Sequence, residues 1–350
     1  MQNELTLTQW RKIINRARLV DISRETGFSV NTVSLALKQR GRMSVQTRSI
    51  INEAAERLHY VPNGLARSLV TNENNSIGVI VRSLKSPVLM EMIGHIEDYL
   101  QKKSYCTIIM GAGKDLAHSV DSLLFQNVGG MLIYPELSQM DLAKFHYLRS
   151  IDFPFVLMSS DGKDHGLDTV YMDRQLGGYK ATTHLASLGH KRIGFIAGDN
   201  MKLEGYRQAL AKQGLPYDER LVVTPRGYRC QGGYDACTEL IKRNQVMTAL
   251  FCSTDSYALG ACKCCRDRGI SVPEDLAVMG YDNLDEAAFA DVPLTTIAYN
   301  IQAETEMAIE LLFRRMRDGT QMTKNENIAL EPELLVRRST AGPKESKEKK

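Results

Sequence analysis

The chain has 350 residues, of which 43% are hydrophobic and 24% are charged, and its formal net charge is +3. These values are typical of a soluble globular protein, and the length predicts two to three domains. No apolar run approaches the roughly 18–20 residues that a transmembrane helix needs. The N-terminal residues also lack an apolar core followed by a small-residue cleavage site. We therefore expect a cytoplasmic protein without a membrane span.

The charge is distributed unevenly along the chain. Residues 1–70 carry 11 basic and 5 acidic side chains, whereas residues 71–343 carry 29 basic and 34 acidic ones. A small basic module is thus joined to a mildly acidic body. Such a module is suited to contact with phosphates, and binding of this kind weakens as salt is added.

Two short helical patterns follow residues 1–17, a stretch to which we assign no role. They flank a turn at Gly27, where glycine supplies the positive φ that a tight turn between helices needs. Ser29 is placed to cap the second helix. Val33 and Leu37 are four residues apart and can pack inward on one face. The pattern predicts a helix-turn-helix whose second helix presents its other side chains to a partner.

A third helix is predicted after residues 43–45, with an apolar face formed by Ile50, Ile51, Ala54, Ala55 and Leu58. Beyond it, Pro62 precedes a short helical pattern over residues 63–70. A helix of one to two turns is marginal by itself because its nucleation is costly. Residues 71–76 form a polar linker with turn residues.

From Ile77 onward, strand-like runs alternate with helical stretches. A first set has strands near 77–81, 106–110, 130–134 and 155–158, with helices near 88–102, 116–126 and 138–149. A second set begins after about residue 160, with strands near 192–198, 221–224, 248–252 and 276–282, and helices near 174–188, 202–213, 230–243 and 255–268. The pattern predicts an α/β body of two doubly wound parallel sheets. Residues 293–300 and a helix at 301–318 follow, and the charged end, 340–350, is expected to be a disordered tail.

The sequence offers no catalytic, metal or cofactor motif. The GAGKD segment (111–115) lacks the first glycine of a phosphate-binding loop, and Asp115 replaces the Ser or Thr that meets magnesium. His184 and His190 are too far apart to bind one metal from adjacent helical turns. The thiols of Cys262, Cys264 and Cys265 lie on one predicted helix and point in different directions, which favours packing over metal binding. We expect neither a cofactor nor enzymatic activity.

Several segments, in the same order, resemble the lactose-repressor (LacI/GalR) family of bacterial transcription regulators. They are DISRETGFSVNTVSLAL, RMSVQTR and HYVPNGLARSL near the N-terminus, and HLASLGHKRIGFIAG, LEGYRQAL, GISVPEDLAVMGYDN and PLTTI further on. The resemblance covers about residues 18–338. It implies an all-α DNA-binding head (18–61), a hinge helix with linker (62–76) and a body similar to periplasmic sugar-binding proteins (77–339). The body would comprise an N-subdomain, about 77–159 plus 293–339, and a C-subdomain, about 160–292.

The resemblance also implies which residues meet DNA. Val30, Asn31 and Leu35 match base-reading positions, where Asn pairs with adenine and apolar side chains contact a thymine methyl. The family usually has Arg at the position of Leu35. Phosphate contacts would come from Ser29, Thr32, Ser34, Arg42, Ser44 and Thr47, although each hydroxyl could instead be a helix cap. In the hinge, Leu69 would wedge between base pairs in the minor groove, beside Asn63, Ala66 and Arg67. The alternative for Leu69 is a buried contact within a short helix.

Effector residues are implied at the strand ends that face a cleft between the two halves. Asp282 matches a carboxylate that accepts hydroxyl donors, and Tyr228 matches an aromatic that stacks on a ring. Four positions depart from the family pattern: Lys202 stands for Arg, Thr254 for Asn, Ser86 for Asn, and Val88 for an aromatic residue. The alternative is that some of these residues are ordinary surface polar groups.

These features together predict a ligand-responsive transcription regulator. We expect a repressor of sugar uptake or catabolic genes that binds an inverted-repeat operator as a homodimer and takes a sugar or sugar derivative as effector. A periplasmic sugar-binding protein would explain the body alone and would need a signal peptide. A sugar-modifying enzyme would explain the cleft but neither the basic head nor the hinge.

Overall fold

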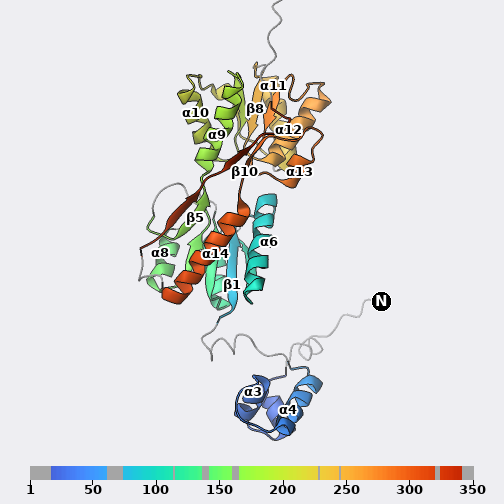
Figure 1. Ribbon diagram of the computed structural model, residues 1–350, viewed down its shortest axis with the longest axis vertical. Helices are drawn as coiled ribbons and strands as arrows, with labels where there is room; N and C mark the ends of the chain where they lie inside the picture. Colours follow the sequence, from blue (N-terminus) through green and yellow to red (C-terminus); the bar gives the residue numbers. More distant parts are fainter. Residues whose placement is uncertain are drawn as a thin grey trace, which may run out of the picture. The chain divides into compact units, whose positions relative to one another are not determined.

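The computed structural model describes residues 17–60, 74–112, 115–135, 142–159, 165–227, 229–243, 246–319 and 324–340. The chain divides into two compact units, Met1–Glu73 and Asn74–Lys350 (Figure 1). We call residues 17–60 the head and residues 74–340 the body. The predicted hinge helix at 63–70 lies outside the described residues, as does the predicted tail (340–350) apart from its first residue, Thr340, whose hydroxyl bonds to Thr295.

The head is a bundle of three helices, α2 (Leu19–Thr26), α3 (Val30–Leu37) and α4 (Val45–Arg57). Gly27 ends α2 with a φ of 74°, and the Ser29 hydroxyl accepts a hydrogen bond from the Thr32 N–H at 3.1 Å. The predicted helix-turn-helix is therefore present. A small core fills the centre of the bundle, formed mainly by Ile22, Val33, Ala36, Ile51, Ala54 and Ala55.

One predicted core residue of the head is wrong. Ile50 is 41% exposed, whereas its neighbour Ile51 is fully buried. Consecutive residues of a helix point about 100° apart, so both side chains cannot face the same narrow core.

The first half of the body is built on a six-stranded sheet with the order β11-β5-β4-β3-β1-β2. All of its strand pairs are parallel. Its central strands are continuous apolar runs, as expected for a parallel sheet that is covered on both faces. The strands are β1 (Ser76–Val81), β2 (Cys106–Gly111), β3 (Gly130–Tyr134), β4 (Phe155–Leu157), β5 (Thr169–Met172) and β11 (Asn327–Leu330). The helices of this half are α6 (Pro87–Lys102), α7 (Leu116–Phe125), α8 (Leu142–Ser150) and α14 (Ile301–Asp318).

The second half carries a four-stranded parallel sheet with the order β7-β6-β8-β9. Its strands are β6 (Ile193–Ile196), β7 (Val222–Val223), β8 (Ala249–Cys252) and β9 (Ala277–Met279). Its helices are α9 (Arg174–Ser187), α10 (Asn200–Lys212), α11 (Arg229–Lys242), α12 (Asp255–Asp267) and α13 (Asp285–Ala288), with a 3-10 turn, η2 (Glu219–Leu221). The two sheets match the predicted doubly wound halves.

A two-stranded antiparallel ribbon of β10 (Thr296–Ala298) and β12 (Glu333–Leu335) lies between the halves (Figure 1). After β10 the chain enters α14, which packs against α6 in the first half. One continuous buried cluster contains residues of both sheets, including Ile77 of β1 and Phe251 of β8. No helix among the described residues is long and apolar enough to cross a membrane.

Both predicted subdomain boundaries are wrong by a short segment. Strand β5 pairs with β4 and β11, so the first half extends to Met172 and does not end near residue 160. The sequence of β5, TVYM, is too short to stand out as an apolar run. At the other end, the Ser339 hydroxyl accepts from the Thr295 N–H and donates to the Val278 carbonyl of β9. The last described residues therefore belong with the second half, whereas residues 293–339 were predicted to lie in the first.

Candidate functional site

The exposed side of helix α3 carries the predicted base-reading residues. Val30 is 42% exposed and Asn31 is exposed, while Val33 and Ala36 face the head core. Leu35 is half-buried, and its methyl group lies 3.5 Å from where a Cβ on Gly41 would stand. Leu35 thus also supports the loop between α3 and α4. The exposed side chains at the start of α3 are therefore free to enter a groove of DNA.

Two Ser-x-x-Thr caps fix the starts of α3 and α4. The Ser29 hydroxyl caps α3 and lies 2.8 Å from the Thr32 hydroxyl, and Ser44 and Thr47 repeat this arrangement at α4. The hydroxyls of Ser29 and Ser44 thus act as helix caps, the role given above as the alternative to phosphate contact. Helix N-termini favour phosphate groups because their backbone N–H groups are incompletely bonded. Ser34 is half-buried and Arg42 is exposed on the same unit.

A cavity of about 70 Å³ lies in the body where the carboxyl ends of strands from both sheets meet. The first half contributes residues after β1, at the end of β3 and at the start of α6, and the second contributes residues after β6, β8 and β9. This is the edge at which parallel α/β sheets bind ligands. The lining residues are Arg82, Ser86, Val88, Leu89, Tyr134, Arg174, Gly198, Asp199, Lys202, Ser253, Thr254, Asp282 and Tyr299.

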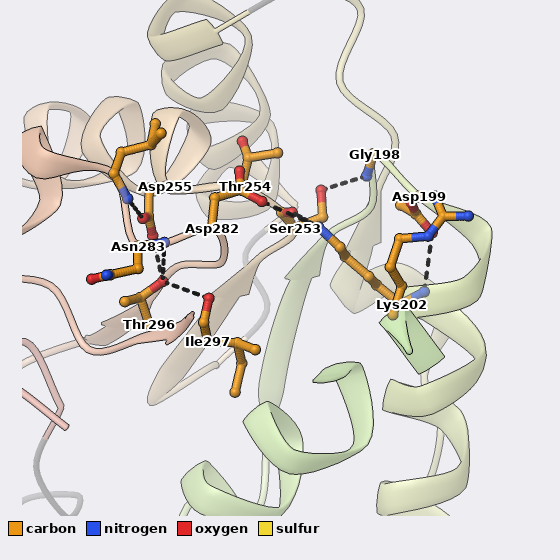
Figure 2. A network of polar contacts seen from close by, with 12 residues as sticks. Gly198, Asp199, Lys202, Ser253, Thr254, Asp255, Asp282, Asn283, Thr296 and Ile297 are labelled. Atoms are coloured by element: carbon orange, nitrogen blue, oxygen red, sulfur yellow. Dashed lines mark hydrogen bonds and ion pairs between the residues drawn. The ribbon is translucent and has the colours of Figure 1, made fainter. Parts of the chain in front are cut away.

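Lys202 and Asp282 form a buried pair on the wall of the second half (Figure 2). The Lys202 ammonium donates to the Ser253 carbonyl at 2.8 Å, lies 3.7 Å from the Asp282 carboxylate and sits 3.4 Å from the centre of the Tyr281 ring. Burial raises the pKa of Asp282 to about 6 against the opposing effect of Lys202, and burial lowers the pKa of Lys202. Asp282 also has a φ of 116°, a strained conformation that is common at functional sites.

Glycine at position 178 brings helix α9 against the turn that carries Lys202. A Cβ on Gly178 would lie 2.3 Å from the Lys202 carbonyl oxygen. Any larger residue would force α9 and α10 apart. The position of the Lys202 ammonium therefore depends on this close approach of two helices.

A second carboxylate, Asp255, is not part of the cavity lining and joins the second half to the ribbon through Thr296 (Figure 2). It accepts hydrogen bonds from the Thr296 hydroxyl of β10 at 2.7 Å and from the Leu284 N–H at 2.8 Å. Burial, with a smaller contribution from Asp282, raises the pKa of Asp255 to about 7. The carboxylate that lines the cavity is thus coupled electrostatically to one that holds the inter-half ribbon.

Arg174 begins helix α9 at the crossover between the halves. Its guanidinium lies 2.7 Å from the Asp199 carboxylate. Asp199 in turn caps α10 by accepting from the N–H groups of Met201 and Lys202. Burial opposes the ionisation of Asp199, but Arg174, Lys202 and two backbone hydrogen bonds together outweigh it, and the pKa of Asp199 is lowered. This pair therefore remains charged within the wall of the cavity.

Glu304, in the first turns of α14, is fully buried, and neither carboxylate oxygen has a hydrogen bond of good geometry. Burial raises its pKa to about 8, partly opposed by the Tyr299 hydroxyl. Tyr299 also lines the cavity. At neutral pH, Glu304 is thus mainly a neutral acid beside a residue that lines the cavity.

Four of the five predicted effector residues line this one cavity: Ser86, Lys202, Thr254 and Asp282. Thr254 caps α12 by accepting from the Tyr257 N–H, while Ser86 precedes α6 without a side-chain capping bond. The remaining predicted positions lie outside the described residues: Tyr228 of the cleft, and Asn63, Ala66, Arg67 and Leu69 of the hinge.

Sequence reasoning missed Arg82, Tyr134, Arg174 and Tyr299. Arg82 directly follows β1, and Tyr134 is the last residue of β3. The rule that ligands bind at strand carboxyl ends could have found both. Arg174 follows β5, the strand that was not predicted, and Tyr299 follows the short strand β10.

The predicted cysteine packing agrees with the structure. Cys264 and Cys265 are fully buried and Cys262 is partly buried, in a cluster between α11, α12 and the second sheet. Across the described part of the chain, no group of three His, Cys, Asp or Glu side chains is arranged to hold a metal ion.

Comparison with known proteins identifies both units. Residues 18–63 match the model for bacterial regulatory proteins of the lacI family, and residues 182–340 match that for a periplasmic binding protein-like domain. A DNA-binding head joined to a periplasmic-binding-protein-like body defines a class of bacterial transcription regulators. The repressor PurR of Pasteurella multocida is 30% identical over 337 residues, covering 92% of this chain and 98% of that protein. The chain belongs to the LacI family and is a DNA-binding transcription regulator.

Other relatives and structures agree. The ribose operon repressor of Haemophilus influenzae is 30% identical over 334 residues, with 92% of this chain and 98% of that protein covered. A LacI-family regulator from Enterococcus faecium with bound ribose superposes with a TM-score of 0.67 at 29% identity, over 76% of this chain and 98% of that one. The lac repressor dimer bound to operator and an anti-inducer shares the fold, with a TM-score of 0.80 at 22% identity over 94% and 100% of the two chains.

Proposed function

We propose that this regulator is a repressor that binds an inverted-repeat operator as a homodimer, under the control of a small polyhydroxylated ligand held in the cavity of the body. The observation that carries the proposal is the convergence of Lys202, Thr254 and Asp282 with Ser86 of the other half on one cavity. A carboxylate can accept two sugar hydroxyls, and an ammonium or hydroxyl can donate to others. The relatives named as repressors, and the ribose-bound neighbour, support the same reading.

In the head, we assign base reading to Val30, Asn31 and Leu35. The exposure of Val30 and Asn31 at the start of α3 supports this assignment. Phosphate contacts are assigned to Ser29, Thr32, Ser34, Arg42, Ser44 and Thr47. The hinge residues Asn63, Ala66, Arg67 and Leu69 would follow in the minor groove, with Leu69 as the wedge.

Ligand control follows from the position of the cavity. Because its walls come from both halves, a bound ligand favours one closure angle of the halves over another. That angle would set the separation of the two hinges in a dimer and so their ability to pair on DNA. The ligand can shift this equilibrium only by its differential affinity for the two states, typically about 1–3 kcal/mol. Such a regulator would act in the cytoplasm, and we infer sugar uptake or catabolic genes as its targets.

The proposal is tested by a gel shift of the full chain on DNA from upstream of its own gene, with and without candidate sugars. A shifted band on a fragment with an inverted repeat, and its loss or gain with one sugar, is the expected result. Binding that is equal on unrelated DNA of the same length would count against a specific operator. Analytical ultracentrifugation of residues 74–350 tests whether the body forms a dimer. A monomer at micromolar concentration would contradict the proposed homodimer.

A further inference from the structure

Five of the seven cysteines gather in the core of the second half. Cys237 of α11, Cys252 of β8, and Cys264 and Cys265 of α12 are fully buried, and Cys262 is partly buried beside them. Thiols packed among apolar side chains are ordinarily inert. Cys264 departs from this pattern because its sulfur is held by polar and charged groups.

A guanidinium and a hydroxyl lie against the sulfur of Cys264. Arg268 Nη1 donates to Cys264 Sγ at 3.1 Å, and the Thr238 hydroxyl lies 3.4 Å from the same atom. A positive charge beside a thiol stabilises the thiolate, which is the reactive form. A hydrogen bond from the Cys237 thiol, with the smaller effects of Thr238 and Arg268, lowers the pKa of Cys264 although burial opposes it.

Cys264 is buried, but the groups on its sulfur are not. Arg268 is exposed, and Thr238 is half-buried. Exposed side chains change rotamer within picoseconds to nanoseconds. Rotation of the Arg268 side chain therefore opens Cys264 Sγ to a molecule as small as hydrogen peroxide.

A second thiol stands ready on the neighbouring helix. The Cys237 thiol is hydrogen-bonded to the thiols of Cys264 and Cys265, and these bonds, with burial, raise the pKa of Cys237. Cys237 thus keeps its proton while Cys264 releases one. The two side chains form a pair of unequal acidity in direct contact.

Glycines bring the two helices close together. A Cβ on Gly233 of α11 would lie 2.1 Å from the Tyr257 carbonyl oxygen, and a Cβ on Gly260 of α12 would lie 1.9 Å from the Cys230 carbonyl oxygen. Helices that pack through larger side chains lie about 8–10 Å apart. A disulfide needs Cα atoms about 4.4–6.8 Å apart, a spacing that such a close approach favours.

We propose that Cys264 is a peroxide-reactive thiol and that Cys237 is its resolving partner, so that oxidation joins α11 to α12 by a disulfide. The Cys264 thiolate attacks one oxygen of hydrogen peroxide and breaks the O–O bond, which leaves a sulfenic acid and hydroxide. The Cys237 sulfur then attacks the sulfenic sulfur, its proton leaves with the oxygen as water, and the disulfide forms. The hydroxide takes up the proton that the Cys264 thiol had released. Two thiols and one hydrogen peroxide thus become one disulfide and two water molecules.

The position of this pair connects it with the ligand cavity. Thr254, at the start of α12, lines the cavity, and Asp255 in the first turn of the same helix is bonded to Thr296 of the ribbon. A close-packed interior transmits a displacement of one helix to its neighbours. The inference goes beyond the proposed function and does not depend on the identity of the ligand.

The test treats the reduced full chain with hydrogen peroxide, blocks the remaining thiols with iodoacetamide and digests the product with trypsin. Cleavage after Arg229, Lys242, Lys263 and Arg266 places Cys237 and Cys264 in separate peptides, 230–242 and 264–266. Mass spectrometry should find these peptides joined, with the mass of two hydrogens less than their sum.

Variants assign the bond, because each of the two peptides holds a second cysteine. Cys237→Ala and Cys264→Ala should each abolish the joined peptides. Cys230→Ala and Cys265→Ala are the matched controls and should still give them. A thermal melt of each variant shows that it folds.

A rate measurement on the parent cysteines serves if a core variant fails to fold. Arg268→Gln should slow formation of the disulfide at pH 7 by about threefold to tenfold, because losing the charge lowers the thiolate fraction of Cys264. Arg268→Lys should retain most of the rate. Arg266→Gln removes an arginine of the same helix that bonds to Asp291 instead, and it should react like the parent.

Three results would overturn the inference. The first is the absence of joined peptides after peroxide treatment of the parent. The second is their persistence in Cys264→Ala or Cys237→Ala. The third is a rate of formation in Arg268→Gln equal to that of the parent.

Discussion

Glu304 gives the most quantitative prediction, because its burial links stability to pH. Its carboxylate is fully buried, and its pKa is raised from 4.5 to about 8 by burial. Between these two values the folded protein holds a proton that the unfolded chain has released. The stabilisation from this group is therefore complete below pH 4.5 and is lost as the pH rises through 8.

The expected size of the effect follows from these two values. One pKa unit corresponds to about 1.4 kcal/mol, so keeping Glu304 protonated costs about 3 kcal/mol at pH 7 and less than about 1 kcal/mol at pH 5. Glu304→Gln removes the titration but keeps the shape. The buried amide has a desolvation cost of its own, which is the same at both pH values. Relative to the parent, the variant should therefore gain about 2–3 kcal/mol of stability between pH 5 and pH 7.

Urea denaturation of the full chain at pH 5 and pH 7, followed on the transition of the body, measures this gain. Glu306→Gln, two residues along the same helix, is the control and should show no such change, because Glu306 is less buried and bonds to Gln302. A stability difference between Glu304→Gln and the parent that stays constant from pH 5 to pH 7 would refute the reasoning. It would mean that Glu304 is ionised in the folded protein.

Four further predictions concern the head, the hinge and, in two cases, the cavity. Gly27→Ala should destabilise the head by about 1–2 kcal/mol, seen as a lower melting temperature and weaker DNA binding. The cause is the φ of 74°, since nothing lies within 4 Å of the added Cβ. Gly27→Asn checks this cause, because Asn tolerates the conformation and should restore the stability of the head. Leu69→Ala should weaken operator binding by a few kcal/mol and non-specific binding much less, because only the specific complex contains the wedge; equal losses on both DNAs at one salt concentration would exclude the wedge. Asp282→Ala should abolish the ligand response and leave ligand-free operator affinity nearly unchanged. In the parent, ligand affinity should fall about tenfold from pH 7 to pH 5, because Asp282 has a pKa of about 6 and protonation removes its negative charge and turns one accepting oxygen into a donor. A dissociation constant, measured by calorimetry, that does not change between pH 7 and pH 5 would contradict this role.

The sequence was sufficient to predict those features of the fold that depend on the pattern of neighbouring residues. The turn at Gly27, the cap at Ser29 and the apolar strands of both sheets are each encoded within a few neighbouring residues, and the structure has them where they were predicted. The family resemblance then supplied Ser86, Lys202, Thr254 and Asp282, which meet at one cavity although they are separated by up to about 200 residues.

The features that were missed depend on tertiary contacts. Strand β5 has only four residues and is recognisable through its pairing with β4 and β11. Without β5, Arg174 could not be placed at a strand end, and its partnership with Asp199 had no sequence signal. The raised pKa of Glu304 likewise comes from burial against residues of other elements. A Glu in the first turn of a helix is usually exposed and stabilised by the helix dipole, so the sequence alone would have assigned it to the surface.

The central claim is that one ligand site in the body controls one DNA-binding head. Fluorescence anisotropy of the full chain on its operator, at fixed salt and with increasing ligand, measures this coupling directly. We expect the operator dissociation constant to change about 5- to 150-fold at saturating ligand, the range for 1–3 kcal/mol of coupling, and not to change in Asp282→Ala. An operator affinity that does not change with a ligand shown by calorimetry to bind the cavity would contradict it.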